Sequence, residues 1–169
     1  MNQFPIKPKK TRKLVLLDIE NLAGSGLVSP EMALQIVKAL NRLCPIDLRD
    51  IVFVGSHKGN FAPCSLVAGM VHGSMCFQNG PNGAELALLR RAGEVPLAAY
   101  ASEIYPINEC VIGSGDHEFV DLALMQKEQG RFVTVVTRSA SLSRELAVIA
   151  DRIIFIDELE TQIENRKAA

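Results

Sequence analysis

Six short apolar runs rich in β-branched residues recur along the chain, and helical patterns separate them. The runs cover residues 14–17, 51–54, 75–77, 110–112, 132–136 and 153–156. Each has the length and composition of a strand that is buried on both faces of a sheet. Strands that alternate with helices are joined by right-handed crossovers, which make the strands parallel and place helices on both faces. The sequence therefore predicts an α/β fold, a three-layer α/β/α sandwich with a mostly parallel sheet.

Helix signals lie between these runs. Ser29 and Pro30 supply an N-cap followed by the proline that a first helical turn favours, and the apolar residues that come next follow helical spacing. These apolar residues are Ala33, Ile36, Val37, Leu40 and Leu43. Other helices are expected over residues 63–72, 83–92, 118–129, 142–149 and 158–166. Asp157 and Glu160 have the spacing of a capping box, which should begin the last of these helices.

The composition fits one globular domain and excludes several classes of protein. The chain has 169 residues, 48% of them hydrophobic and 22% charged, which is unlike a disordered or fibrous protein. A chain of this length can bury roughly 70% of the surface that it exposes when unfolded. No apolar run approaches the roughly 20 residues of a membrane span, and the four cysteines show no CxxC spacing. We therefore expect reduced thiols, a cytoplasmic location and no membrane or zinc site.

Basic residues are concentrated before the first apolar run, although the net charge of the whole chain is only −1. They are Lys7, Lys9, Lys10, Arg12 and Lys13. We interpret residues 1–12 as a basic N-terminal arm and residues 13–169 as a single domain. Such an arm could contact nucleic-acid phosphates, whose neutralisation releases counterions, or it could serve only as a solubilising tail.

Carboxylates follow the apolar runs at the points where a parallel sheet binds its ligands. Asp18 ends the first run and Asn21 lies three residues later, whereas Asp116 and Glu118 follow the fourth run after two glycines that allow a tight turn. The first and fourth strands of a doubly wound sheet commonly lie side by side, so Asp18 and Asp116 should converge. A divalent cation between them would offset their repulsion. Mg²⁺ prefers such oxygen ligands, and phosphoester hydrolysis is its natural use.

Each of these acids also has a structural explanation. Asp116 could cap the following helix, and Asp18 could be an ordinary turn residue after a strand. Asn82 and Glu85 have the spacing of a capping box at a helix start, where a carboxylate satisfies free amides. Their spacing alone does not decide between a structural and a chemical role.

The order of the motifs resembles that of NYN domains, members of the PIN-like nuclease superfamily. Residues 16–22, Leu-Leu-Asp-Ile-Glu-Asn-Leu, look like the opening strand of that family with its Asp-x-x-Asn motif. Residues 82–88 are similar to its Gly-x-Asp-x-x-Leu helix start, and residues 112–119 resemble its Ser-Gly-Asp-x-Asp-Phe motif. Residues 130–136 and 150–154 look like its closing strands. The resemblance covers nearly the whole chain.

The resemblance implies a PIN-like sheet, one or two Mg²⁺ or Mn²⁺ ions, and hydrolysis of RNA that leaves a 5′-phosphate. Carried over to this chain, it makes Asp18, Glu85 and Asp116 metal ligands, Glu118 an outer or direct ligand, and Asn21 a polar support for Asp18 or the substrate. The family often has Asp where Glu85 and Glu118 stand, and an acid where this chain has Arg91.

The expected substrate is RNA, single-stranded or structured, and its phosphates would meet basic side chains. The candidates are Lys9, Lys10, Arg12, Lys13, Arg90 and Arg91. A homo-oligomer or a regulatory protein partner is compatible with the sequence.

Two other functions remain open beside the ribonuclease. A PIN-like domain could bind RNA or protein without cutting, although an aromatic content of 5% with no Trp gives little support for a base-stacking platform. A phosphohydrolase of the haloacid-dehalogenase type also begins with a strand-end Asp. That chemistry requires a second Asp two residues later, where this chain has Glu20. The retained acids favour the ribonuclease.

Overall fold

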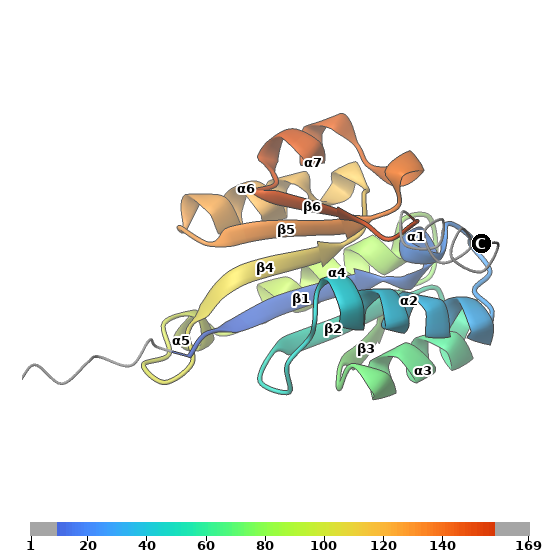
Figure 1. Ribbon diagram of the computed structural model, residues 1–169, viewed down its shortest axis with the longest axis horizontal. Coiled ribbons are helices and arrows are strands. Elements are labelled where there is room, and N and C mark those ends of the chain that lie inside the picture. Colours follow the sequence, from blue (N-terminus) through green and yellow to red (C-terminus); the bar gives the residue numbers. More distant parts are fainter. Residues whose placement is uncertain (1–9, 158–169) are drawn as a thin grey trace, which may run out of the picture.

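A computed structural model describes residues 10–157, which form one six-stranded sheet between two layers of helices (Figure 1). The strands are β1 (Arg12–Asp18), β2 (Ile51–Ser56), β3 (Ser74–Phe77), β4 (Ile107–Gly113), β5 (Phe132–Thr137) and β6 (Arg152–Phe155). All are parallel, in the order β3-β2-β1-β4-β5-β6. The predicted fold class and all six predicted strands are confirmed.

The helices between the strands agree with the sequence patterns where those patterns are long. The helices are α1 (Ile19–Ala23), α2 (Pro30–Leu43), α3 (Phe61–Met70), α4 (Gly83–Gly93), α5 (Leu97–Tyr100), α6 (Val120–Glu128) and α7 (Arg144–Ile149). Short 3₁₀ turns are η1 (Lys58–Asn60), η2 (His117–Phe119) and η3 (Ser139–Ser141). The short helices α1 and α5 have no counterpart in the sequence prediction. The helix expected over residues 158–166, with the Glu160 half of its capping box, lies outside the described residues.

Helix α2 forms as its N-cap predicts. Ser29 Oγ accepts a hydrogen bond from the N–H of Met32 at 3.2 Å, and Pro30 occupies the first helical position. The buried residues of the helix are Ala33, Ile36, Val37 and Leu40. They fall on one face because they recur at helical spacing, and this face packs against the sheet.

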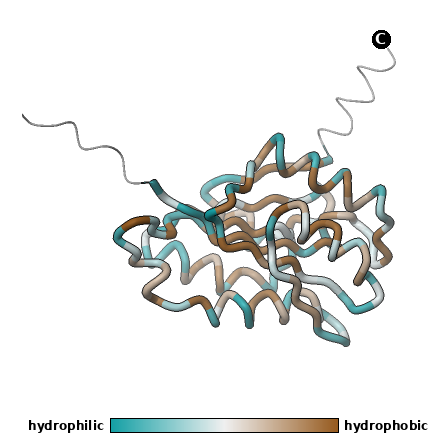
Figure 2. Tube along the Cα trace, turned by 90° about the horizontal axis from the view of Figure 1, so that it is seen from below, coloured by the Kyte–Doolittle hydropathy of each residue, from teal (hydrophilic) through white to brown (hydrophobic). Residues whose placement is uncertain are grey.

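Both faces of the sheet are covered, and β1 is the centre of the core. Val15 and Leu17 pack with α1, α2 and α3 on one face, whereas Leu14 and Leu16 pack with α4, α6 and α7 on the other. All four side chains are fully buried. Figure 2 shows hydrophobic residues along the central strands and more hydrophilic ones on the outer turns. Burial of such a side chain contributes roughly 1.5–3 kcal/mol, so β1 anchors the fold.

The connections leave β1 in two directions and create a switch point beside it. The chain passes from β1 through β2 to β3 on one side, and then returns to β4 on the other side of β1. Leu17 pairs with Gly113, and Asp18 pairs with Gly55. Ligands of open α/β sheets bind beyond the carboxyl ends of the strands at such a point. We call this end of the sheet the carboxyl edge, and the opposite end the amino edge.

The domain begins slightly earlier than the apolar run suggested. Arg12, which was expected in the basic arm, is the first residue of β1, and its Nη2 donates to the carbonyl of Ala99 at 3.1 Å. Lys13 also belongs to the strand. No helix within residues 10–157 is long and apolar enough to cross a membrane.

Candidate functional site

Asp18 is the last residue of β1 and the best buried acid at the carboxyl edge, with only 1% of its surface exposed. Its Oδ1 accepts hydrogen bonds from the N–H groups of Glu20 and Asn21, each at 3.1 Å. Asp18 therefore caps the five-residue helix α1. Asp18 thus has a structural role as a helix cap, which differs from the turn residue considered from the sequence, and the cap fixes the carboxylate at the switch point.

Ser114 connects Asp18 to the loop that carries Asp116. The buried Ser114 Oγ donates to Asp18 Oδ2 at 3.4 Å and accepts from the N–H of Asp116 at 3.3 Å. Asp116 Oδ1 in turn accepts from the N–H of Glu118 at 3.0 Å and caps η2. The adjacency of β1 and β4 thus brings Asp18 and Asp116 to the same end of the sheet, as the fold prediction required.

Gly115 allows this loop to pack closely. Neither Gly113 nor Gly115 has a positive φ, so the tight turn expected from two glycines is not the reason for them. A Cβ on Gly115 would lie 2.3 Å from the carbonyl oxygen of Ser141. The N–H of Gly115 donates to Asn21 Oδ1 at 2.9 Å. Asn21 therefore gives polar support to both the Asp18 cap and the Asp116 loop.

Glu85 reaches Asp18 from the first turn of α4. The Glu85 carboxylate lies close enough to Asp18 to raise its pKa by repulsion, and Glu85 is half-buried. Asn82 makes no capping hydrogen bond to α4, so the predicted capping box is wrong. Asn82 instead adopts a left-handed conformation with φ of 55°, and its Nδ2 donates to Glu118 Oε1 at 2.9 Å. Helix α4 and η2 are thereby joined across the site.

Glu20 belongs to the same group of acids, although the sequence analysis did not propose it as a site residue. Its Oε1 accepts from Ser56 Oγ at 2.8 Å, from the N–H of His57 at 2.6 Å, and from Asn60 Nδ2 at 2.9 Å. These three donors follow the end of β2 and hold the carboxylate above it. The alternate spacing of Asp18 and Glu20 was the available signal. We call Asp18, Glu20, Glu85, Asp116 and Glu118 the carboxylate cluster.

The charges of the carboxylate cluster are poorly compensated. Burial raises the pKa of Asp18 to about 7, and the neighbouring Glu85 carboxylate contributes to the rise. Burial also raises the pKa of Glu85, with Asp116 and Glu20 adding repulsion. Within residues 10–157 no Lys or Arg forms an ion pair with Asp18, Glu20 or Glu85. The cluster therefore favours any ligand that brings positive charge.

His117 also lies at the cluster, although it was not among the candidate site residues. Its Nδ1 lies 3.0 Å from Asp116 Oδ1, and its Nε2 lies 3.7 Å from Glu118 Oε1. An open cleft of about 550 Å³ begins here. The cleft is lined by His117, Glu118, Val120, Asp121, Ser143 and Glu145. Its three carboxylates make it an unfavourable path for a phosphate backbone.

The predicted basic residues do not gather at the cluster. Arg90 and Arg91 lie in the last turn of α4, whereas Glu85 lies in its first turn. Arg91 pairs with Glu94 at 2.6 Å and lies over the Phe53 ring at 4.7 Å.

The basic residues that precede and begin β1 lie at the amino edge. Arg12 and Lys13 are the first residues of β1, roughly 20 Å from Asp18 at the other end of the strand. Lys10 is exposed just before them, and Lys9 lies outside the described residues. Lys10, Arg12 and Lys13 therefore lie at the end of the sheet opposite the carboxylate cluster.

Oxygen atoms dominate the donor set that the cluster offers to a metal ion. Within residues 10–157 no three His, Cys, Asp or Glu side chains are already arranged to hold an ion. A buried, repelled carboxylate among other oxygen donors nevertheless fits the chemistry of a hard cation, and Glu85 and Asp116 are the side chains that would join Asp18.

Comparison with known proteins bears on the fold and leaves the chemistry open. No protein-family model matches the chain, and no curated protein matches it. A crystal structure of a protein of unknown function from Vibrio parahaemolyticus is similar, with a TM-score of 0.54 and 13% sequence identity. The similarity covers 90% of this chain and 96% of that one. It supports the fold alone.

Proposed function

We propose that this protein is a metal-dependent ribonuclease that hydrolyses phosphodiester bonds at the carboxylate cluster. The observation that carries the proposal is the buried Asp18 at the switch point, with a pKa raised by burial and by Glu85, and with no Lys or Arg paired to it. Repulsion of this kind is costly for a structural role alone, and carboxylates with perturbed pKa values that gather at the carboxyl ends of strands favour a functional one. The resemblance of the motifs to NYN domains supports the same class of reaction.

The proposed cofactor is Mg²⁺ or Mn²⁺, held by Asp18, Glu85 and Asp116, with Glu118 binding directly or through water. When bound, such a cation neutralises phosphate charge and lowers the pKa of a water molecule. Side chains of the protein hold these carboxylates in position. Ser114 and Asn21 fix Asp18 relative to the Asp116 loop, and Asn82 orients Glu118. The buried, free cysteines suit a cytoplasmic location for the enzyme.

The test compares two acids of the carboxylate cluster, Glu85 and Asp116, with Glu94 at the far end of α4. Labelled single-stranded RNA is incubated with the full chain in Mn²⁺, Mg²⁺ or EDTA, and Mn²⁺ binding is measured by calorimetry. We expect Glu85→Gln and Asp116→Asn to reduce cleavage at least 100-fold and to weaken Mn²⁺ binding. Glu94→Gln is the matched control, because Glu94 caps the opposite end of α4 and pairs with Arg91. It should leave cleavage unchanged.

A second function receives support from one observation. Asp18 accepts hydrogen bonds from the N–H groups of Glu20 and Asn21 and from Ser114 Oγ, so the chain itself holds this carboxylate in place, as a binding module without a metal would require. RNA binding without cleavage, combined with no Mn²⁺ binding, would replace the ribonuclease by this alternative. Cleavage that persists in EDTA would contradict the proposed metal dependence.

A further inference from the structure

The two sides of the carboxylate cluster differ in charge. On the side of β4 and α7, the cleft carries Glu118, Asp121 and Glu145. On the side of β2 and β3, the chain has no Asp or Glu between Asp50 and Glu85. On the first side a phosphate backbone that reaches the cluster meets three more carboxylates, whereas on the second side it meets none beyond Glu20, so it should leave over β2 and β3.

A pair of aromatic rings, one exposed and one partly buried, lies on this second side. Phe61 begins α3, Phe77 ends β3, and their rings stack with centroids 5.6 Å apart and an interplanar angle of 27°. Phe61 is 57% exposed. A large aromatic ring at the start of a helix gains little stability from such exposure, which is better explained by a ligand that covers it. We call Phe61 and Phe77 the stacked pair.

The stacked pair is tied to the cluster by short connections. Phe77 pairs in register with Ser56, whose Oγ donates to Glu20. Phe61 directly follows Asn60, whose Nδ2 donates to the same Glu20 oxygen. Phe77 is two strands away from Asp18, roughly 10 Å across the sheet. A nucleotide close to a scissile phosphate at Asp18 could therefore place its base on the rings.

Polar groups around the stacked pair suit a nucleotide. Lys58 and His57 are exposed beside Phe61, where a cation can meet a phosphate. The loop between β3 and α4 contributes the amides of Gln78, Asn79 and Asn82, which can hydrogen-bond to base edges. Stacking on an aromatic face tolerates any base sequence, because every base has a π-face.

We propose that the stacked pair is a binding site for one unpaired nucleobase of the RNA, so that the enzyme selects single strands. This inference rests on the proposed function, because it assigns the substrate class to the same cluster. A base held in a duplex has both faces covered by its neighbours and cannot stack on Phe61. The low aromatic content of the chain gives no indication of this site, because two of the seven phenylalanines are enough to form it.

The experiment measures binding of labelled single-stranded RNA by fluorescence anisotropy, with the full chain in an Asp116→Asn background. We expect Phe61→Ala and Phe61→Leu each to weaken binding about tenfold, since Leu keeps the apolar volume without the ring. Met70→Ala is the matched control, because Met70 is a partly exposed residue at the other end of α3. It should leave binding unchanged.

A set of RNAs with one abasic nucleotide each identifies the base. One position should lose affinity for the protein with intact Phe61 and lose none for Phe61→Ala, because both changes remove the same contact. Equal affinities for intact and Phe61→Ala protein, or additive losses at every position, would overturn the inference. If the stacked pair instead binds another protein, Phe61→Ala leaves the affinity for RNA unchanged, and the inference fails.

The cleavage assay separates this inference from the proposed function. If RNA is cleaved in an EDTA-sensitive way while Phe61→Ala binds normally, the stacking site fails and the ribonuclease stands. If Phe61→Ala and the abasic position are non-additive while no RNA is cleaved, the stacking site stands and the ribonuclease fails.

Discussion

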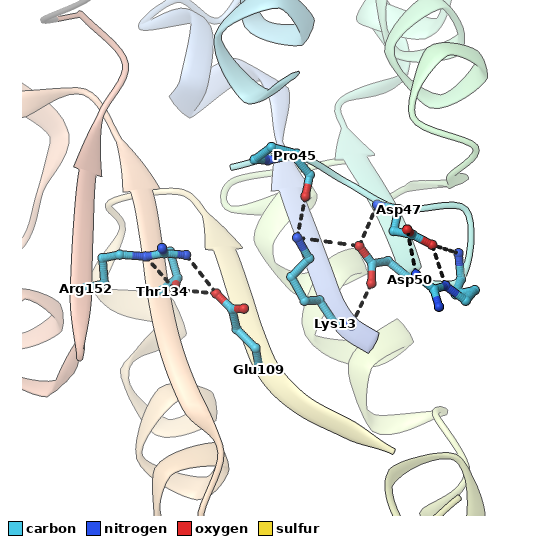
Figure 3. A network of polar contacts seen from close by, with 8 residues as sticks. Lys13, Pro45, Asp47, Asp50, Glu109, Thr134 and Arg152 are labelled. Carbon is cyan, nitrogen blue, oxygen red and sulfur yellow. Dashed lines mark hydrogen bonds and ion pairs between the residues drawn. The ribbon is translucent and has the colours of Figure 1, made fainter. Parts of the chain in front are cut away.

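Carboxylates at the two ends of the parallel strands lie in opposite electrostatic surroundings. At the amino edge Asp50 accepts from the N–H of Lys13 at 2.7 Å and pairs with its Nζ at 3.6 Å, and Glu109 pairs with Arg152 at 3.0 Å (Figure 3). At the carboxyl edge Asp18 and Glu85 face each other and further acids. The chain can pair its acids with cations, as the amino edge shows. Within residues 10–157 no Lys or Arg pairs with Asp18, Glu20 or Glu85 at the carboxyl edge, which supports the proposed site there.

The largest expected effect concerns how the carboxyl edge is held together. Gly115→Ala should lower the free energy of unfolding by about 3–5 kcal/mol, because its Cβ would overlap the Ser141 carbonyl and push the Asp116 loop from β5. Urea unfolding followed by circular dichroism measures it. Gly69→Ala is the control, since nothing lies within 4 Å of that position in α3. It should be neutral or slightly stabilising. Equal small effects for both would show that close packing does not hold this edge.

Asp18→Asn should stabilise the protein in EDTA. The folded pKa of about 7 exceeds the ordinary 3.8, so the folded chain keeps a proton between about pH 4 and 7 that the unfolded chain releases. Wild-type stability therefore falls as the pH rises through this window, whereas an amide does not ionise. The gain should be absent near pH 4 and reach about 2–4 kcal/mol at pH 8. Urea unfolding across pH measures it, and a loss of stability at pH 8 would contradict the electrostatic description of this edge.

The same type of substitution at the amino edge should have the opposite sign. Asp50→Asn removes the ion pair with Lys13 and weakens the hydrogen bonds that Asp50 accepts from the N–H groups of Lys13 and Asp47. The side chain is nearly buried, so we expect a loss of about 1–3 kcal/mol at pH 8. The measurement is again urea unfolding at pH 8. If Asp50→Asn and Asp18→Asn changed stability in the same direction, the contrast between the two edges would fail.

The smallest expected effect concerns the basic arm, which enters the domain at the amino edge. Removal of residues 2–10 takes away Lys7, Lys9 and Lys10 but spares Arg12 and Lys13, which β1 uses. Stability should not change. For long RNA, the slope of log affinity against log salt should become shallower by up to about 2, and short RNA confined to the carboxyl edge should show no difference. Identical slopes for long RNA would make the arm a solubilising tail.

The sequence predicted the sheet well because the six apolar runs have few other ways to be buried. Doubly wound connectivity then placed Asp18 and Asp116 at the same edge. Helix α1 was missed because five residues carry too short a pattern, and its formation depends on the Asp18 cap. Asn82 was misassigned because a capping box needs a particular backbone conformation, and Asn82 has a positive φ instead. Spacing alone does not determine that conformation.

Other parts of the site depend on contacts between distant segments. Glu20 became a site residue only through donors from the end of β2, 36 to 40 residues away. The stacked pair likewise joins α3 to β3, and no local pattern in the sequence indicates that Phe61 and Phe77 meet. Arg90 and Arg91 were proposed to contact the substrate because Arg91 stands where the resembled family has an acid, but α4 places them at the end opposite Glu85. Spacing in the sequence did not predict how far a side chain lies from the cluster where the direction of a helix determines that distance.

The link between Asp18 and Ser114 has a consequence for folding. The two residues are 96 positions apart in the chain, and parallel strands separated by so many residues pair slowly because their loop must close first. A growing chain that has not yet produced β4 contains Asp18, Glu20 and Glu85 but lacks Ser114 and Asp116. During synthesis the hydrogen bond from Ser114 to Asp18 and the repulsion between Asp116 and Glu85 are therefore added only after the residues of β1, β2 and β3 are already present. We expect the cluster to be among the last parts of the domain to form, after the hydrophobic core whose burial offsets the repulsion.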